Sequence, residues 1–368
     1  MNIAVDVREA CGRSTGVGRY ISELLAEWSA QPEAQRHTWR LYAHTHPGGD
    51  RPWADSVRVL EGDGGTAWEQ WTFSRELARD RPDVLFAPAY TAPLTAAAPT
   101  VLTVHDVSYF AHREWFSLRE GTRRRLLTAW SARRARLVLT DSEFSRSEIL
   151  THIGLPDARV RAIALGVRPL AGSTSGPAPA IAGSPREPIV LYAGSVFARR
   201  RVDQLIAAFD SVADRVPAAR LEIVGENRTV PYVDLDALRR QTRHADRITI
   251  RSYVDEPTLR SLYARASVFA FLSEYEGFGL TPLEALASGV APLLLDTPIA
   301  RETCGPAARY APATETQPAV VDALTDLLTH DAAREAVLRH APTVLARFNW
   351  TQTAAATLHA LEEAGGVA

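Results

Sequence analysis

The apolar segment Val268-Phe-Ala-Phe-Leu-Ser273 is followed, after two residues, by Glu276-Gly-Phe-Gly-Leu-Thr-Pro-Leu-Glu284. The first segment is apolar almost without interruption, as a parallel strand that is buried on both faces should be. The second segment places a Gly-Phe-Gly turn and the start of a helix between two carboxylates. We therefore predict a strand, a glycine turn and a helix N-terminus in succession, which is the local plan of an α/β sheet.

The groups gathered at this turn indicate the chemistry of a ligand. Glycines let a ligand approach the backbone closely, and a helix start offers N–H groups that bind anions such as phosphate. The carboxylates of Glu276 and Glu284 do not suit phosphate, but they suit hydroxyl groups. We therefore expect a ligand that carries both phosphate and sugar. For Glu284 an alternative stays open, because Thr281-Pro-Leu-Glu284 is also a capping box, with Thr281 as N-cap and Pro282 at the first helical position.

Strand-like and helix-like segments alternate along the chain, which predicts two parallel sheets covered by helices. We expect an α/β protein with an N-terminal Rossmann-like domain over residues 1–167, a Pro/Gly/Ser-rich linker over 168–188, a second Rossmann-like domain over 189–348 and a final helix over 349–368. Helix 19–28 has its apolar side chains on one stripe. The clearest predicted strands cover 2–7, 38–43, 84–87, 100–105, 136–140, 189–193, 221–224, 248–252, 268–272 and 291–295.

The composition excludes several kinds of protein. The formal net charge of −2 creates no field that would attract nucleic acid. All 41 basic residues are arginine, so Schiff-base lysine chemistry, including that of a pyridoxal phosphate phosphorylase, and a P-loop lysine are excluded. Cys11 and Cys304 lie far apart and are expected to be unpaired thiols in a reducing compartment. No signal peptide and no membrane-spanning run is evident, so we expect a cytoplasmic protein.

A second candidate site follows the predicted strand 189–193, where the sequence reads Gly194-Ser-Val-Phe-Ala-Arg199-Arg200-Arg201. Guanidinium groups make paired, charge-assisted hydrogen bonds to phosphate oxygens, so this loop suits a diphosphate. The alternative is a solvated basic helix start, which the helix dipole disfavours. We take Arg199 and Arg200 as phosphate-binding candidates and Ser195 as a further donor-binding residue.

Two further candidates follow predicted strands of the first domain. Gly16 and Gly18 precede a helix, as the glycines of a dinucleotide-binding site do. The loop before them is too long for such a site, and the second predicted strand does not end in the acid that would bind a ribose. We therefore expect a glycine loop that approaches a sugar diphosphate. His105 ends another strand, with Asp106 placed to orient the loop or the histidine. A helix begins after Asp141-Ser142, where capping is the expected role of both residues.

The stretch from Arg113 to Arg136 mixes aromatic residues with arginines. Basic amphipathic helices bind anionic lipid surfaces, so this stretch could contact such a surface or a lipid diphosphate acceptor. A solvated helix face is the alternative. The arginines of the central part are Arg119, Arg123, Arg124, Arg125, Arg133 and Arg134.

The order of these motifs resembles the retaining glycosyltransferases of family 4, which have the GT-B fold of two doubly wound domains facing across a cleft. The motifs on which this resemblance rests are Glu-x7-Glu around Gly-Phe-Gly-Leu, Gly-x4-Arg-Arg, the glycine loop, the His-Asp pair and Ser-Glu-Phe-Ser. Arg200 stands where the family usually has lysine, which exchanges a point charge for a planar fork. In the family the last helix usually returns to the first domain.

The resemblance implies residue roles. Arg199 and Arg200 would stabilise the departing diphosphate, helped by the backbone of Gly277, Phe278, Gly279 and Leu280. Glu276 would orient the donor sugar, Glu284 the nucleotide ribose and His105 the far edge of the sugar. No metal is expected, because arginines replace the cation.

The activity that the resemblance implies is hexosyl transfer from a nucleotide diphosphate sugar to a hydroxyl of a glycan, glycolipid or polyprenyl-diphosphate-linked acceptor. GDP-mannose is the first expectation for the donor, in assembly of surface polysaccharide such as lipopolysaccharide. Peripheral contact with the membrane is a further expectation. The alternatives are a catalytically silent nucleotide-sugar-binding or scaffold protein and a nucleotide-sugar epimerase.

Overall fold

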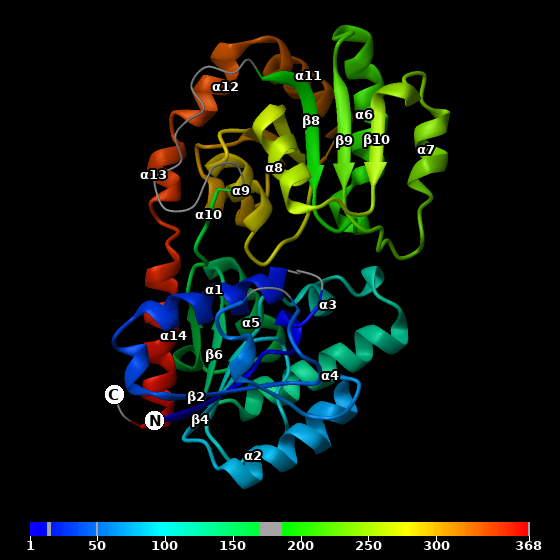
Figure 1. The fold of residues 1–368 in the computed structure, drawn as a ribbon. Helices are drawn as coiled ribbons and strands as arrows, with labels where there is room; N and C mark the ends of the chain where they lie inside the picture. Colours follow the sequence, from blue (N-terminus) through cyan, green and yellow to red (C-terminus); the bar gives the residue numbers. More distant parts are fainter. Residues whose placement is uncertain (13–15, 49–50, 170–185, 315, 367–368) are drawn as a thin grey trace. The chain divides into compact units, whose positions relative to one another are not determined.

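The computed structural model describes residues 1–12, 16–48, 51–169, 186–314 and 316–366, and these form two compact units. Unit 1 contains residues 1–166 and 348–368, and unit 2 contains residues 167–347. Most of the predicted linker, residues 170–185, lies outside the described residues. Each unit is an α/β fold with its own parallel sheet (Figure 1).

Unit 1 has a seven-stranded sheet in the order β3-β2-β1-β4-β5-β6-β7, and every described strand pair is parallel. The strands are β1 (Asn2–Asp6), β2 (Thr38–Ala43), β3 (Val57–Val59), β4 (Val84–Ala87), β5 (Thr100–Thr103), β6 (Leu137–Thr140) and β7 (Val160–Ala162). The helices are η1 (Arg8–Ala10), α1 (Gly16–Ala30), η2 (Ala34–Arg36), η3 (Ala54–Ser56), η4 (Trp68–Phe73), α2 (Ser74–Asp80), α3 (Ser108–Ala111), η5 (Arg113–Trp115), α4 (Leu118–Arg134), α5 (Glu143–Ile153), η6 (Asp157–Arg159) and α14 (Trp350–Gly365).

Unit 2 repeats this topology with a six-stranded sheet in the order β10-β9-β8-β11-β12-β13, again parallel in every described pair. The strands are β8 (Glu187–Ala193), β9 (Arg220–Val224), β10 (Ile248–Arg251), β11 (Ala266–Phe271), β12 (Ala291–Leu295) and β13 (Arg309–Ala311). The helices are η7 (Ala198–Arg200), α6 (Val202–Arg215), α7 (Leu235–Gln241), η8 (Ala245–Arg247), α8 (Glu256–Arg265), α9 (Leu280–Ala287), α10 (Pro298–Cys304), α11 (Thr316–Thr329), α12 (Asp331–Leu338) and α13 (Ala341–Leu345).

The buried strands explain why the sequence forms these sheets. Every residue of β4, β5, β6, β11 and β12 is buried, as expected for central parallel strands covered on both faces. Helix α1 buries the stripe that was predicted from its sequence, namely Tyr20, Ile21, Leu24, Leu25 and Trp28. The predicted α/β class with two Rossmann-like sheets is therefore confirmed.

The last helix packs on unit 1. Trp28 in α1 donates a hydrogen bond of 2.9 Å from Nε1 to the carbonyl of Ala354 in α14. Thr353 donates one of 2.7 Å to the carbonyl of Ala164. A Cβ on Gly166 would lie 2.3 Å from the Trp350 backbone nitrogen, so the chain passes this helix where only glycine fits. Helix α14 thus completes the core of the N-terminal unit from the far end of the sequence.

Both sheets reverse their strand order at one point. In unit 1, β2 and β3 lie on one side of β1, and β4 to β7 lie on its other side. The strand order therefore reverses between β1 and β4. In unit 2 it lies between β8 and β11. Ligands of open α/β sheets bind beyond the carboxyl ends of the strands at such a reversal. The loops after β1, β4, β8 and β11 are therefore the positions to search for a site.

Candidate functional site

In unit 2 the loops after β8 and β11 bind each other through three consecutive arginines. Arg200 donates from Nε to Glu276 Oε1 at 2.7 Å and from Nη2 to Glu276 Oε2 at 3.0 Å. Arg199 donates from Nε to the carbonyl of Tyr275 at 2.9 Å, and Arg201 donates from Nε to Glu274 Oε1 at 2.5 Å. The candidates Arg199, Arg200 and Glu276 therefore lie together at the reversal of the strand order.

The carboxylate of Glu276 is held ionised at this position. Its side chain is 14% exposed. Burial opposes ionisation, but the guanidinium groups of Arg200 and Arg199 outweigh it and lower the pKa of Glu276 from 4.5 to about 2. Ser273 adds a hydrogen bond of 2.8 Å from Oγ to Glu276 Oε1. The acid is therefore a fixed anion that can accept hydrogen bonds from hydroxyl groups but cannot donate a proton near neutral pH.

The two arginines differ in the donors that they leave for a ligand. Arg200 uses Nε and Nη2 on Glu276 and Nη1 on the carbonyl of Ser195, and its guanidinium lies over the rings of Phe197 and Phe271. Arg199 uses Nε on Tyr275, and its Nη2 lies 3.7 Å from Glu276 Oε2. Arg199 therefore keeps more N–H groups for an anion, whereas Arg200 mainly fixes Glu276.

The glycine turn leads directly into helix α9. Gly279 has a φ of 91°, a conformation that favours glycine, and is the N-cap residue, so Leu280 is the first residue of the helix. The predicted capping box at Thr281 is wrong, because the helix begins before Thr281 and no side chain caps it. The reason is that the glycine turn sets the helix start two residues earlier than the capping pattern indicated.

A small pocket adjoins the turn. Its volume is about 20 Å³, and Glu276, Phe278 and Gly279 line it together with apolar residues of β12 and α10. This space holds about one water molecule, so it adjoins a ligand site but does not enclose a nucleotide sugar. Glu284 lies on α9, only 3% exposed, and does not line this pocket. Its predicted contact with ribose stays a prediction.

The predicted donor-binding residues around the turn differ in what they offer. Ser195 contributes its carbonyl, which accepts hydrogen bonds from Arg200 Nη1 at 2.7 Å and from the Tyr192 hydroxyl at 2.9 Å. Phe278 is buried. Gly277 lies in the turn between Glu276 and α9, and Leu280 is the first residue of α9. The segment 276–280 therefore lies after the carboxyl end of β11, where it leads into α9.

In unit 1, His105 follows β5 and is 8% exposed. Its Nδ1 donates to Asp141 Oδ2 at 2.7 Å, and its Nε2 donates to the carbonyl of Pro88 at 2.9 Å. Burial opposes protonation, but Asp141 and the Pro88 carbonyl outweigh it and raise the pKa of His105. Both ring nitrogens therefore face hydrogen-bond acceptors, which favours the protonated imidazole next to the loops after β4 and β5.

The neighbours of His105 correct one sequence interpretation. Ser142 is the N-cap of α5 and accepts a hydrogen bond from the Ser145 backbone, as expected, but Asp141 does not cap the helix and binds His105 instead. Asp106 orients its loop, accepting from the backbone and hydroxyl of Ser108. The carboxylate after β6 reaches the histidine because parallel strands end side by side.

Gly16 and Gly18 belong to the start of α1. Gly16 is exposed, and a Cβ there would meet no atom within 4 Å. Packing within unit 1 therefore gives no reason for glycine at Gly16, which is compatible with approach of a ligand. Residues 13–15 of the same loop lie outside the described residues.

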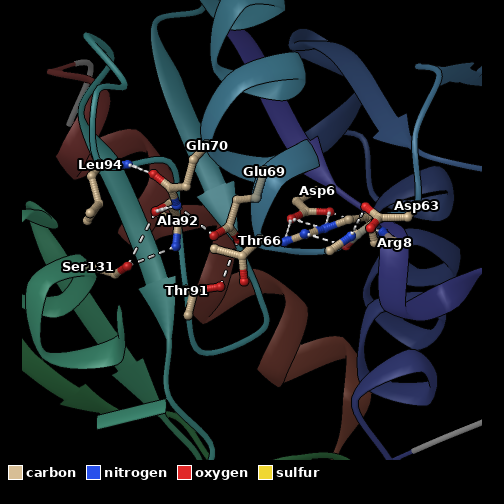
Figure 2. A network of polar contacts seen from close by, with 12 residues as sticks. Asp6, Arg8, Asp63, Thr66, Glu69, Gln70, Thr91, Ala92, Leu94 and Ser131 are labelled. Atoms are coloured by element: carbon tan, nitrogen blue, oxygen red, sulfur yellow. Dashed lines mark hydrogen bonds and ion pairs between the residues drawn. The ribbon is translucent and has the colours of Figure 1, made fainter. Parts of the chain in front are cut away.

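The sequence interpretation missed a polar network after β1. Figure 2 shows Arg8 between Asp6 and Glu69. Arg8 donates from Nε to both oxygens of Asp6 at 3.0 and 2.9 Å and from Nη2 to Glu69 Oε1 at 2.6 Å. Glu69 lies in η4, a π-helix, and also accepts from Thr91 at 2.7 Å. Both acids are buried, so the network fixes the loop after β1 to η4 and to the segment after β4.

The candidates thus form two groups, one in each unit. Arg199, Arg200, Ser195 and the segment from Glu276 to Leu280 meet at the edge of the unit 2 sheet. His105 and the glycines of α1 belong to unit 1. A single site built from both groups, in a cleft, stays a prediction. Among the described residues, no group of three or more metal-ligating side chains is placed to hold a metal ion.

Two family models match the chain. The model described as "Glycosyltransferase Family 4" matches residues 14–169, and the model described as "Glycosyl transferases group 1" matches residues 179–343. The chain belongs to the family 4 glycosyltransferases. The first match covers most of the N-terminal unit and the second covers most of unit 2, so the resemblance seen in the motifs extends over both.

Curated relatives include an O-antigen chain mannosyltransferase B of Escherichia coli, 28% identical over 281 residues, which are 71% of this chain and 69% of the relative. A mannosylfructose-phosphate synthase of Agrobacterium fabrum is 34% identical over 107 residues, 27% of this chain and 24% of the relative. A glycogen synthase of Mycobacterium tuberculosis is 27% identical over 57% of this chain and 51% of the relative. The chain thus spans from a quarter to about two thirds of the length of these relatives.

Solved structures share the fold. A sucrose-phosphate synthase of Thermosynechococcus elongatus has a TM-score of 0.75 at 19% identity, covering 100% of both chains. Alr3699/HepE of Anabaena, in complex with UDP and glucose, has a TM-score of 0.74 at 17% identity, covering 99% of this chain and 100% of that chain. Family and fold agree with the GT-B class of glycosyltransferases.

Proposed function

We propose that this glycosyltransferase moves a hexose, with mannose as the first candidate, from a nucleotide diphosphate sugar to an acceptor hydroxyl, with retention of the anomeric configuration. The acceptor would be a glycan, glycolipid or polyprenyl-diphosphate-linked sugar of surface polysaccharide assembly. One observation carries this proposal: the reversal point of the unit 2 sheet holds a fixed carboxylate, Glu276, directly beside the guanidinium groups of Arg199 and Arg200.

The comparisons support the donor class and the sugar. The Anabaena protein is described in complex with UDP-glucose as well as with UDP and glucose. A relative in Xanthomonas oryzae pv. oryzae, 28% identical over 30% of this chain and 29% of its own length, is named a GDP-mannose:cellobiosyl-diphosphopolyprenol alpha-mannosyltransferase. The relative in Escherichia coli is also named a mannosyltransferase. These names make GDP-mannose the first donor to test.

The chemistry divides between the two arginines and the acid. Arg199, with N–H groups that the loop does not use, would bind the diphosphate, and the backbone N–H groups at the start of α9 would add donors. As the bond from the anomeric carbon to the phosphate oxygen breaks, negative charge grows on the leaving diphosphate. Fixed cations and N–H dipoles stabilise that charge without reorganisation.

Glu276 would orient the sugar. A carboxylate has about four acceptor positions, and here Oε1 accepts from Arg200 and Ser273 while Oε2 accepts from Arg200. Oε2 therefore keeps an acceptor position for a sugar hydroxyl. Because Glu276 stays ionised, it does not serve as a general acid. For retention, the acceptor oxygen bonds to the anomeric carbon on the face that the diphosphate leaves, and the acceptor proton passes to the leaving phosphate oxygen.

The alternatives make different predictions for the same assay. A silent nucleotide-sugar-binding protein would bind the donor without consuming it, and an epimerase would convert the donor to another nucleotide sugar without an acceptor. A transferase consumes the donor, releases nucleoside diphosphate and adds the sugar to an acceptor. The lowered pKa of Glu276 and the raised pKa of the buried His105 are perturbations typical of functional sites, and they favour catalysis over binding alone.

The experiment is a thermal-shift panel of GDP-, UDP-, dTDP- and ADP-sugars, followed by donor consumption with each stabilising sugar. A donor at 100 times its dissociation constant should stabilise the fold by about 2.7 kcal/mol. We expect the GDP-sugar to raise the melting temperature most, and the stabilising donor to be hydrolysed or transferred above background. Stabilisation without donor consumption, with or without a lipid-linked acceptor, would favour the silent protein.

A further inference from the structure

Helix η4 holds the loop after β4 through two neighbouring side chains (Figure 2). Thr91 donates from Oγ1 to Glu69 Oε1 at 2.7 Å. Gln70 donates from Nε2 to the carbonyl of Ala92 at 3.2 Å, and its Oε1 accepts from the backbone N–H of Leu94 at 2.9 Å. The loop after β4 is therefore tied to η4 at residues 91, 92 and 94. A π-helix such as η4 occurs frequently at functional sites.

The carboxylate of Glu69 is itself held from the loop after β1. Glu69 is 1% exposed, and Arg8 donates to it from Nη2 at 2.6 Å. Arg8 also donates from Nη1 to the carbonyl of Gly64 at 2.9 Å, and its guanidinium lies 5.0 Å from the ring centroid of Trp68. A buried carboxylate is costly unless it is paired and hydrogen-bonded, so these contacts fix where Glu69 lies. The hydroxyl of Thr91 therefore binds a fixed acceptor.

The residue before Thr91 has an unusual backbone. Tyr90 has a φ of 66°, in the left-handed region that a bulky side chain rarely adopts. Its N–H still donates to the carbonyl of Thr103 in β5 at 2.9 Å. Such a conformation persists only where the surrounding structure fixes it, and it is commonest at functional sites. The hydrogen bond from Thr91 to Glu69 provides that fixation one residue further along the chain.

The turn at residues 88–90 surrounds part of His105. The Tyr90 ring meets the imidazole edge-on with centroids 5.4 Å apart, and the Pro88 carbonyl accepts from Nε2 at 2.9 Å. The ring of Tyr20 in α1 is also edge-on, at 5.1 Å, and Asp141 binds Nδ1 at 2.7 Å. Two of these four contacts come from residues 88–90. Movement of this turn would therefore move the imidazole.

We propose that Glu69 and Thr91 are positioning residues for His105: they hold the turn at Tyr90, which sets where the imidazole lies and thereby the rate of sugar transfer. This inference rests on the proposed function, in which His105 lies against the donor sugar. In that proposal the affinity for the donor comes mainly from Arg199 and the start of α9. A displaced imidazole therefore lowers kcat and leaves the KM for the donor unchanged.

The first test is the kinetics of the Thr91 variants. Thr91→Val replaces the hydroxyl with a methyl group of similar size, and it should lower kcat about 10- to 100-fold, since a displacement of about 1 Å can have that effect. Thr91→Ser keeps the hydroxyl and should restore the wild-type kcat. The matched control is Thr95→Val, because the Thr95 hydroxyl in the same loop lies 2.6 Å from Ser74 Oγ in α2, further from Tyr90. This control should keep the wild-type kcat and KM.

The acid is tested in the same way. Glu69→Gln removes the charge that pairs with Arg8, and it should lower kcat without changing the KM for the donor. The matched control is Glu76→Gln. Glu76 is a buried acid of α2 that pairs with Arg79 at 3.2 Å. Both substitutions remove a buried carboxylate, but only Glu69 binds the loop after β4, so Glu76→Gln should keep the wild-type kcat at temperatures below its unfolding transition.

The titration of His105 gives a readout that a merely structural role would not move. In protein with ¹³C-labelled histidine, the resonance of His105 is assigned by its absence from His105→Gln and reports the pKa of the ring. The charged and titratable groups around the ring are Asp106, Asp141, Tyr20 and Tyr90. The Pro88 carbonyl raises the pKa of His105, so a loosened turn should lower this pKa in Thr91→Val and Glu69→Gln but not in Thr95→Val.

Four results would overturn the proposal. They are a wild-type kcat in Thr91→Val, an equally low kcat in Thr91→Ser, an equal loss of kcat in Thr95→Val, and an unchanged pKa of His105 in Thr91→Val and Glu69→Gln. Failure of the proposed function is seen separately, as a wild type that consumes no donor. The titration needs no donor, so in that case it alone decides whether Glu69 and Thr91 position the imidazole.

Discussion

The buried pair of Arg200 and Glu276 allows stability to be separated from activity. Lowering the pKa of Glu276 from 4.5 to about 2 corresponds to about 3 kcal/mol in favour of the ionised, folded form, at about 1.4 kcal/mol for each pKa unit. Glu276→Gln removes that contribution and leaves the buried guanidinium of Arg200 without its counterion. Breaking one partner of a buried pair costs about 3–5 kcal/mol.

We therefore expect Glu276→Gln to lower the melting temperature of unit 2 by roughly 6–20 °C. Arg200→Met should have a similar effect, because it leaves the buried carboxylate unpaired. The double variant Arg200→Met/Glu276→Gln should recover most of the loss, because no uncompensated charge remains. The difference between the double variant and the sum of the single variants gives a coupling free energy, which we expect to be about 5–8 kcal/mol, because the single variants together cost about 6–10 kcal/mol and the double variant about 1–2 kcal/mol.

Activity should not follow this recovery. All three variants should lose transfer by at least about 100-fold, because each lacks either Glu276 or the guanidinium of Arg200 that holds Glu276 ionised and in place. Urea unfolding gives the coupling, and release of nucleoside diphosphate gives the activity. A coupling near zero would refute the geometry of the pair, and near wild-type turnover by Glu276→Gln would refute the role of the acid.

Three further predictions use other residues. Arg199→Ala should weaken donor binding, measured by calorimetry, about 10- to 100-fold, because a charge-assisted hydrogen bond contributes about 1.5–3 kcal/mol. Arg199→Lys should weaken donor binding less. Equal donor binding by the wild type and Arg199→Ala would contradict the role of Arg199. The pKa of His105 is raised in the folded state, so its protonation stabilises the fold fully below pH 6.5, and this stabilisation is lost as the pH rises through the folded pKa. Between pH 6 and 9 the melting temperature of His105→Gln should therefore fall less than that of the wild type. Parallel melting curves for the two proteins would count against this prediction. Glu284→Gln should chiefly weaken donor binding, and a lower melting temperature with unchanged binding would assign Glu284 a structural role.

The sequence predicted the central strands because their apolar runs are long and bounded by turn residues. The edge strands β3, β7 and β13 have three residues each and were missed, because so short a run carries no period. The start of α9 was misplaced because the capping pattern at Thr281 and the glycine turn at Gly279 compete over the same residues, and the turn prevails. Local patterns thus determined the elements but not each boundary.

The residues of the candidate site could be predicted from the sequence, but the hydrogen bonds between them could not. The position of Arg199, Arg200 and Glu276 at strand ends followed from the sequence, since the carboxyl ends of parallel strands share an edge. The bidentate pairing of Arg200 with Glu276 depends on β8 and β11 being neighbours, and residues 76 apart carry no local signal of this. Asp141 was assigned to capping for the same reason: its partner His105 lies on another strand.

The network of Asp6, Arg8 and Glu69 also joins distant segments. The sequence does show an acid at a strand end, Asp6, followed two residues later by Arg8. This spacing could have indicated an ion pair, but the sequence interpretation did not use it.

The most direct measurement of the central claim is a crystal structure with a bound nucleotide diphosphate sugar, using the donor that stabilises the protein most. We predict a diphosphate oxygen at about 3 Å from an Nη atom of Arg199 and a sugar hydroxyl at about 3 Å from Glu276 Oε2. A donor bound elsewhere, with Arg199 and Glu276 free of contact to it, would contradict the account.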